Sequence, residues 1–157
     1  MDKKRTLLME EIWESQNEAW ALMNEYDSLP HQYGDFVLHQ AEAEMIDLIA
    51  LHPDITVTDL SHILRKTPSA CSQIVKKLRT KKWVDQTRDE NNNRQYKLKL
   101  TDEGYLLFKE HTKFENNCKA NTFDKLSIFN ADELQTFLKI QHKLNEAYAE
   151  DVENSKQ

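Results

Sequence analysis

The 157-residue sequence contains little glycine, proline and cysteine, and each shortage excludes a class of protein. Only two Gly and three Pro occur, so long helices can run without interruption, and the glycine-rich phosphate loop of nucleotide-binding enzymes is missing. The two cysteines, Cys71 and Cys118, lie far apart and form no paired-cysteine metal motif. Such sparse cysteine is typical of a reducing cytoplasm rather than of a disulfide-bonded secreted domain.

Long hydrophobic runs are also missing from the sequence. No stretch reaches the roughly 18 apolar residues that a membrane span needs, and the charged start at residues 1–6 lacks the apolar segment of a signal peptide. The short motifs of serine hydrolases and zinc proteases are absent. We therefore expect a cytoplasmic protein that is not an enzyme, needs no cofactor and has no membrane partner.

The charge of the chain is strongly polarised, although its net value is −6. Residues 53–100 contain eleven Lys/Arg and five Asp/Glu, a formal charge of +6, whereas the rest carries −12. A basic centre between acidic ends can present a positive face to phosphates. The distribution of charge along the chain therefore favours a nucleic-acid partner, although the net charge is negative.

Apolar residues at helical spacing predict helices at 5–27 and 40–51. The first carries Trp13 and Trp20, a stripe that fits either ordinary core or a dimer interface, since aromatic residues are enriched in interfaces. Residues 28–34 break the pattern and predict a loop. In the second helix Met45, Leu48 and Ile49 are expected to point inward.

Two capped helices follow. Thr56 and Asp59 match a capping box that begins a short helix, in which Leu60, Ile63 and Leu64 are expected to be buried. Thr67 then suits the N-cap, and Pro68 the first position, of a helix that runs to about residue 80. Its predicted buried stripe, at i, i+3, i+4 and i+7, consists of Cys71, Ile74, Val75 and Leu78.

Two alternating segments, residues 83–86 and 96–100, flank a polar, asparagine-rich connection and predict a β-hairpin. A helix from residue 102 to about 121, a less regular connector and a last helix at 131–152 complete the chain. The fold class is therefore mainly α with a small β-hairpin wing. We divide it into residues 1–38 (N-terminal helix and loop), 39–101 (winged helix-turn-helix) and 102–157 (C-terminal helices). The terminal parts are expected to form a homodimer.

The helix at 68–80 is the predicted reader of double-stranded DNA, because its outer face is polar and its N-terminal side chains are small enough for close approach to bases. Gln73 can pair with adenine, and Lys76 can reach guanine or a phosphate. Each residue could also be ordinary solvated surface. The predicted contacts on and beside this helix are Thr67, Ser69, Ala70, Ser72, Gln73, Lys76 and Lys77.

Residues 43–111 resemble the MarR family of bacterial transcription regulators. The matching pieces are residues 54–60, residues 67–78, Arg88-Asp89, and Arg94 ahead of residues 100–104. The resemblance implies that Arg94 enters the minor groove with Arg88 in support, and that the protein is a dimeric repressor released by a small-molecule effector. The family usually has Asp two residues before the wing arginine, where this sequence has Asn92.

Two alternatives remain. A winged helix can serve as a protein–protein module without DNA, and some relatives respond to zinc. The candidate metal ligands are Glu44, Glu110, His111 and Glu115, but Met45 stands where zinc-sensing relatives have His, and two acids with one imidazole on a helix are more typical of a solvated face. We expect no metal site, and we interpret Cys71 as a small buried hydrophobic residue.

Overall fold

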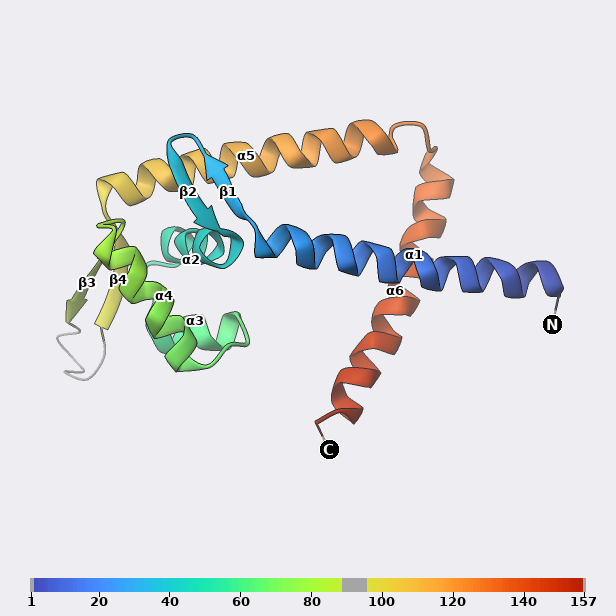
Figure 1. Ribbon diagram of the computed structural model, residues 1–157, viewed down its shortest axis with the longest axis horizontal. Coiled ribbons are helices and arrows are strands. Elements are labelled where there is room, and N and C mark those ends of the chain that lie inside the picture. Colours follow the sequence, from blue (N-terminus) through green and yellow to red (C-terminus); the bar gives the residue numbers. More distant parts are fainter. Residues whose placement is uncertain (1, 89–95, 157) are drawn as a thin grey trace. The chain divides into compact units, whose positions relative to one another are not determined.

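The computed structural model describes residues 2–88 and 96–156 (Figure 1). The described residues form six helices and two antiparallel two-stranded sheets, which confirms the predicted mainly α class with a β-hairpin. In chain order the elements are α1 (Lys3–Ser28), β1 (Pro30–Tyr33), β2 (Phe36–His39), α2 (Gln40–Leu51), α3 (Val57–Ile63), α4 (Pro68–Thr80), β3 (Val84–Arg88), β4 (Tyr96–Leu100), α5 (Asp102–Leu126) and α6 (Ala131–Asn154). The chain divides into two compact units, Met1–Phe114 and Glu115–Gln157.

The hairpin β1–β2 corrects the predicted loop at residues 28–34. Its strands pair from Pro30↔His39 to Tyr33↔Phe36, which leaves a two-residue turn at Gly34-Asp35. Gly34 has a φ of 59°, a conformation that glycine adopts without steric cost. A Gly-Asp pair between alternating residues is a hairpin signal, but strands of four residues are too short for their periodicity to stand out.

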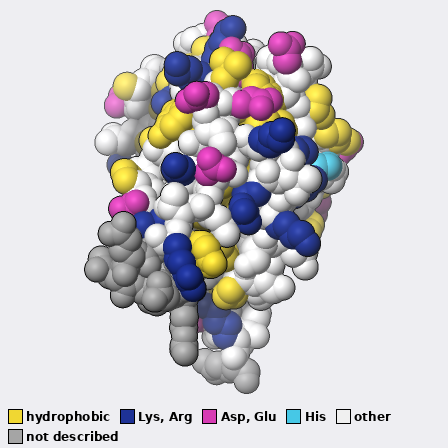
Figure 2. All heavy atoms as spheres, turned by 90° about the vertical axis from the view of Figure 1, so that its left-hand side faces the viewer, with side chains coloured by type: hydrophobic (Ala, Val, Ile, Leu, Met, Phe, Trp, Pro, Cys, Tyr) yellow, Lys and Arg dark blue, Asp and Glu magenta, His cyan; other side chains and the backbone are white. Residues whose placement is uncertain are grey.

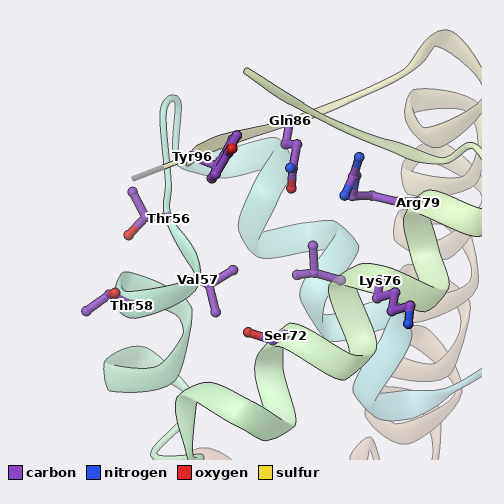
Figure 3. A pocket seen from close by; sticks show the side chains of 9 residues that line it. Thr56, Val57, Thr58, Ser72, Lys76, Arg79, Gln86 and Tyr96 are labelled. Atoms are coloured by element: carbon purple, nitrogen blue, oxygen red, sulfur yellow. The ribbon is translucent and has the colours of Figure 1, made fainter. Parts of the chain in front are cut away.

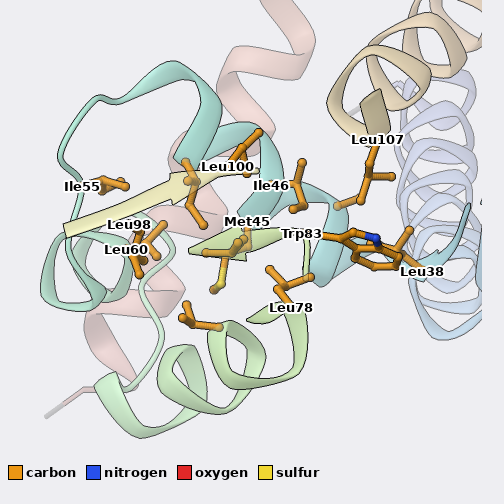
Figure 4. Packing of buried hydrophobic residues seen from close by; sticks show 14 of the residues in the cluster. Leu38, Met45, Ile46, Ile55, Leu60, Leu78, Trp83, Leu98, Leu100 and Leu107 are labelled. Carbon is orange, nitrogen blue, oxygen red and sulfur yellow. The ribbon is translucent and has the colours of Figure 1, made fainter. Parts of the chain in front are cut away.

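The hydrophobic core lies between α2, α3, α4 and the β3–β4 hairpin (Figure 4). The predicted inward positions Met45, Leu60 and Leu78 are fully buried. The prediction for Ile63 is wrong, because half of its side chain is exposed. Helix α3 has only seven residues, so its narrow buried face reaches the core through Leu60 and Ser61.

The hairpin β3–β4 lies where alternation predicted it, with strands paired from Val84↔Leu100 to Arg88↔Tyr96. The segment before α3 adds to its edge, since the Leu98 N–H donates to the Ile55 carbonyl at 2.9 Å. Lys97 also lies 3.3 Å from the carboxylate of Asp54. These contacts hold the base of the hairpin against the start of α3.

The long helices have few buried residues within the single chain. Neither α1 nor α6 buries any residue, and Trp20 on α1 is 71% exposed. Helix α5 continues to Leu126 rather than ending near residue 121, so the predicted connector is shorter and Phe123 is helical. In the part of the chain that the structure describes, no helix is both long enough and apolar enough to cross a membrane.

Candidate nucleic-acid interface

Helix α4 has the two-faced character that a reading helix needs. Cys71, Val75 and Leu78 are buried against the core. Thr67 caps the helix, accepting a hydrogen bond from the Ala70 N–H at 3.2 Å, and Pro68 occupies the first turn. The cap and the buried stripe fix both the start of α4 and its rotation about its own axis, so the opposite face is directed to solvent.

The residues predicted to contact DNA occupy that outer face. Ala70 is half-buried, and the other predicted positions on and beside α4 are exposed: Thr67, Ser69, Ser72, Gln73, Lys76 and Lys77. Arg88, which is also exposed, ends strand β3 on the hairpin. Arg94 and Asn92 lie outside the described residues. The structure thus brings the described candidates to one side of the N-terminal unit, on α4 and the adjoining hairpin.

The predicted capping box closes the start of α3. The Asp59 N–H donates to Thr56 Oγ1 at 3.2 Å, and the Thr56 N–H donates to Asp59 Oδ2 at 2.9 Å. The Thr56 hydroxyl also donates to that carboxylate oxygen at 2.7 Å. These hydrogen bonds from Thr56 hold the pKa of Asp59 below its ordinary value. The carboxylate therefore remains ionised at neutral pH and keeps the helix start closed.

A cavity of about 270 Å³ opens between α3, α4 and the hairpin (Figure 3). Lys76 and Arg79 line it from α4, Gln86 and Tyr96 line it from the hairpin, and the start of α3 closes the other side. Its full lining is Thr56, Val57, Thr58, Ser72, Val75, Lys76, Arg79, Gln86 and Tyr96. The hydroxyl groups and the two cationic side chains that line this cavity could bind a phosphate or another anion.

Arg79 was missed at the level of sequence. It lies three residues after Lys76, a spacing that places both side chains on one face of a helix. That spacing was a signal in the sequence. The face that carries α3, α4 and the hairpin is turned toward the viewer in Figure 2, where Lys and Arg predominate over the lower half and acidic side chains mix with them above.

Lys77 has an internal partner. Its Nζ lies 2.8 Å from Oε1 of Glu42 on α2, and the Nζ of Lys81 lies 3.8 Å from the same oxygen. The Lys77 side chain is still 54% exposed, whereas that of Glu42 is only 5% exposed. Glu42 was not identified from the sequence, because the pairing joins residues 35 positions apart on two helices.

The four candidate metal ligands do not form a cluster. Glu44 is exposed on α2, and His111 is buried with its Nδ1 2.9 Å from the carboxylate of Asp47. The Tyr33 ring packs edge-on against the His111 ring, with 4.8 Å between the two ring centroids. Across residues 2–88 and 96–156, no group of three or more His, Cys, Asp or Glu could hold a metal ion. The sequence identified His111 but not its carboxylate partner.

Cys71 is completely buried in the core, as interpreted from the sequence, and burial raises the pKa of its thiol. A buried thiol with a raised pKa forms little of the reactive thiolate. Cys118 is exposed on α5. The buried face of α4 is therefore packed around a sulfur of low reactivity.

Comparison with known proteins agrees with the family resemblance. Residues 38–95 match the model of the MarR family, which confirms the resemblance inferred from the sequence. Members of the family are transcription regulators and not enzymes. A comparison with curated protein sequences finds no match.

Solved structures share the fold over nearly the whole chain. FabT from Streptococcus pneumoniae, in complex with DNA, is 23% identical with a TM-score of 0.67, covering 96% of this chain and 99% of its own. The zinc-responsive MarR family member ZitR from Lactococcus lactis is 16% identical with a TM-score of 0.77, covering 90% and 99%. The adhesin competence repressor AdcR from Streptococcus pyogenes is 21% identical with a TM-score of 0.65, covering 92% and 97%. At these identities the likeness establishes the winged-helix fold.

Proposed function

We propose that this protein is a sequence-specific DNA-binding transcription regulator that reads the major groove with α4. The observation that carries the proposal is the exposed polar face of this helix. Small side chains, Ser69 and Ser72, precede Gln73 and Lys76, while the opposite face is buried in the core. Such a face permits close approach to base edges, and Gln73 offers the paired donor and acceptor that adenine matches.

The cavity beside α4 fits a phosphate of the DNA backbone. A helix in the major groove and a hairpin at the neighbouring minor groove have one backbone strand between them. Lys76, Arg79 and the Ser72 hydroxyl on α4, together with the Thr58 hydroxyl on α3, offer charge-assisted and neutral hydrogen bonds there. Contacts of this kind fix register without reading sequence.

The hairpin supplies the second contact. Arg94, which lies outside the described residues, is proposed to enter the minor groove, where the negative potential is strongest over A·T-rich sequence. Arg88 at the end of β3 is proposed to support it through a phosphate. The proposal rests on the match of residues 38–95 to the family model and on the position of the hairpin beside α4.

The functional form is proposed to be a homodimer. Helices α1 and α6 bury no residue within the single chain, although both carry large apolar side chains. Unburied apolar surface of this extent is unfavourable in water and typical of an interface. The exposed apolar residues of these helices are Leu7, Leu8, Met9, Trp13, Trp20, Leu22, Met23, Tyr26, Phe137, Leu138, Ile140 and Val152.

We further propose repression, relieved by a small-molecule effector, as the mode of regulation. AdcR, which shares the fold, is a repressor. A zinc response is a property of ZitR and is not proposed here, because the described residues contain no group of three or more His, Cys, Asp or Glu that could hold a metal ion. The alternative function is a protein–protein interaction module that does not bind DNA. A titration of DNA with the protein distinguishes this alternative from the proposed regulator.

The titration tests the function directly. Labelled DNA from the region upstream of the gene, and a scrambled fragment of equal length, are titrated with protein between about 50 and 200 mM salt. We expect a dissociation constant of roughly 10⁻⁸ M or tighter for one upstream fragment, at least about a thousandfold tighter than for the scrambled one. Affinity falls steeply with salt, because bound phosphates release counterions.

Matched variants locate the interface. Lys76→Gln and Arg79→Gln are each expected to weaken binding to both fragments and to flatten the salt dependence. Lys143→Gln on α6, whose side chain is 78% exposed, is the control and leaves binding unchanged. Equal, weak affinity for both fragments with no salt dependence would refute DNA recognition and favour the protein–protein module.

A further inference from the structure

Three elements meet at the carboxylate of Glu42. This residue is in the first turn of α2, and its side chain is only 5% exposed. Its Oε2 accepts a hydrogen bond from the backbone N–H of His39, the last residue of β2, at 3.0 Å. Its Oε1 lies 2.8 Å from Lys77 Nζ and 3.8 Å from Lys81 Nζ, both on or directly after α4. One carboxylate therefore joins the end of β2, the start of α2 and the recognition helix.

We call these contacts of Glu42 with His39, Lys77 and Lys81 the Glu42 junction, and this junction depends on the two lysines. A carboxylate removed from water is costly unless opposite charges and hydrogen bonds compensate it. Within the described part of the chain no hydroxyl or amide group donates to Oε1, so the two ammonium groups supply its compensation. Lys81 also lies over the ring of Trp83, 4.5 Å from the ring centroid, which extends the contact to the residue that precedes β3.

We propose that Glu42 is a positioning residue that fixes the recognition helix against α2 and holds Lys77 and Lys81 as internal counter-ions rather than as phosphate contacts. The inference deepens the proposed function and rests on it. It divides the basic residues of α4 into two groups. Lys76 and Arg79 line the cavity beside the hairpin, whereas Lys77 and Lys81 lie against Glu42.

This division of the lysines has a consequence for specificity. Phosphate contacts strengthen binding to every sequence equally, so two further free cations on α4 would raise affinity for random DNA. By pairing with both, Glu42 offsets one of their two charges and limits that affinity, and it also holds the base-reading face of α4 in position. Phosphate contacts alone leave the ratio of specific to non-specific affinity unchanged, so a fall in that ratio when Glu42 is replaced would come from a helix α4 that is no longer held in position for reading bases.

The first experiment measures the junction without DNA. Melting temperatures are compared for wild type, Glu42→Gln, Lys77→Met and the double variant. Each single variant is expected to lower the melting temperature by several degrees, and the double variant by no more than the larger single effect, because both remove the same interaction. Lys77→Arg, which keeps the charge, is expected to stay near wild type. Additive shifts would overturn the junction whether or not the protein binds DNA.

The second experiment measures the role in recognition. A DNA site selected by the wild-type protein from a random-sequence pool, and a scrambled fragment, are titrated between about 50 and 200 mM salt. Lys77→Met is expected to leave the salt slope unchanged, whereas Lys76→Met lowers it by about one for each phosphate that the lysine no longer neutralises. Glu42→Gln is expected to steepen the slope and to reduce the ratio of specific to non-specific affinity about tenfold.

The outcomes separate the two proposals. A slope that falls equally for Lys77→Met and Lys76→Met would make Lys77 a phosphate contact and overturn the assignment to Glu42. If the Glu42→Gln protein is folded and its ratio of specific to non-specific affinity is unchanged, the proposed role of Glu42 in specificity is wrong. If the wild type selects no site at all, the proposed function fails, and the melting experiment still decides whether the junction exists.

Discussion

A Cβ atom on Gly104 would lie 2.0 Å from the backbone carbonyl oxygen of Trp83. The same carbonyl accepts a hydrogen bond from the Thr101 N–H at 3.1 Å, and the Thr101 hydroxyl donates to the carbonyl of Lys82 at 2.7 Å. The start of α5 is therefore packed directly on the turn that follows the recognition helix. Glycine at position 104 permits this contact, because any side chain would collide with backbone that cannot rotate away.

We expect Gly104→Ala to destabilise the protein by roughly 3 kcal/mol, the upper end of the range for overpacking a closed interior. Gly34→Ala is the matched comparison. Its Cβ would meet the flexible side chain of Glu110 at 3.0 Å, at a φ of 59°, and we expect a loss of roughly 1 kcal/mol. Urea denaturation measures both. Equal losses would show that the start of α5 moves aside at little cost.

Lys82, two residues after the end of α4, has a left-handed conformation with a φ of 62°. The Trp83 N–H donates to the Leu78 carbonyl at 3.0 Å, the hydrogen bond of a helix end at which glycine is usual. We expect Lys82→Gly to stabilise the protein by about 0.5–1 kcal/mol, because it removes the Cβ strain. Lys82→Ala keeps that strain and is expected to give no gain in the same denaturation series. A similar gain from both variants would assign the effect to charge instead.

Acid is expected to weaken the Glu42 junction. Burial alone would raise the pKa of Glu42, but the hydrogen bond from Lys77, the His39 N–H and the charges of Lys81 and Lys77 together hold it below its ordinary value of 4.5. The folded state therefore binds this proton less readily than the unfolded state. The stabilisation is fully present above pH 4.5 and is lost as pH falls through the folded pKa.

The measurement is the difference in unfolding free energy between wild type and Glu42→Gln, followed from pH 7 downward. We expect the difference to be constant near neutrality and to shrink below about pH 4.5. Taking the difference between the two proteins cancels the pH dependence that other carboxylates with a lowered pKa, such as Asp59, contribute to both. A difference that grows on acidification would mean that folding raises the pKa of Glu42 instead of lowering it.

The homodimer predicts a mass of twice the 18.6 kDa of the chain in light scattering. Trp20→Glu is expected to raise the dimer dissociation constant at least tenfold, because it places a charge in an apolar interface. Ser15→Glu adds the same charge to an exposed polar part of α1 and is the control. A wild-type monomer at micromolar concentration, unchanged by DNA, would contradict the prediction.

Gln73 is expected to read one base in each half-site. Gln73→Ala is predicted to cost about 1–3 kcal/mol on the selected site and to relax the preference at a single position. Ser69→Ala, on the first turn of the same helix, is the comparison for a small side chain. Selection from random DNA by each variant is the measurement. An unchanged preference in Gln73→Ala would place direct readout elsewhere on α4.

Local sequence determined most of the helix-turn-helix. The helix at 40–51 and the one at 68–80 have the predicted bounds, because an amphipathic period coincides there with a strong start or stop, such as Thr67-Pro68. The capping box at Thr56 and Asp59 formed as predicted for the same reason, since its hydrogen bonds join residues three positions apart. Where local preferences agree with one another, the sequence alone is sufficient.

Tertiary structure decided the features that join distant parts of the chain. Glu42 meets Lys77 because α2 and α4 pack together, and Asp47 meets His111 because α2 also lies against α5. The charged residues themselves stand out in the sequence, but their pairing does not, because a hydrogen bond or ion pair has no signature along the chain beyond a few residues. Sequence therefore determined which face of α4 is exposed, and packing determined that Lys77 on this helix is paired with Glu42.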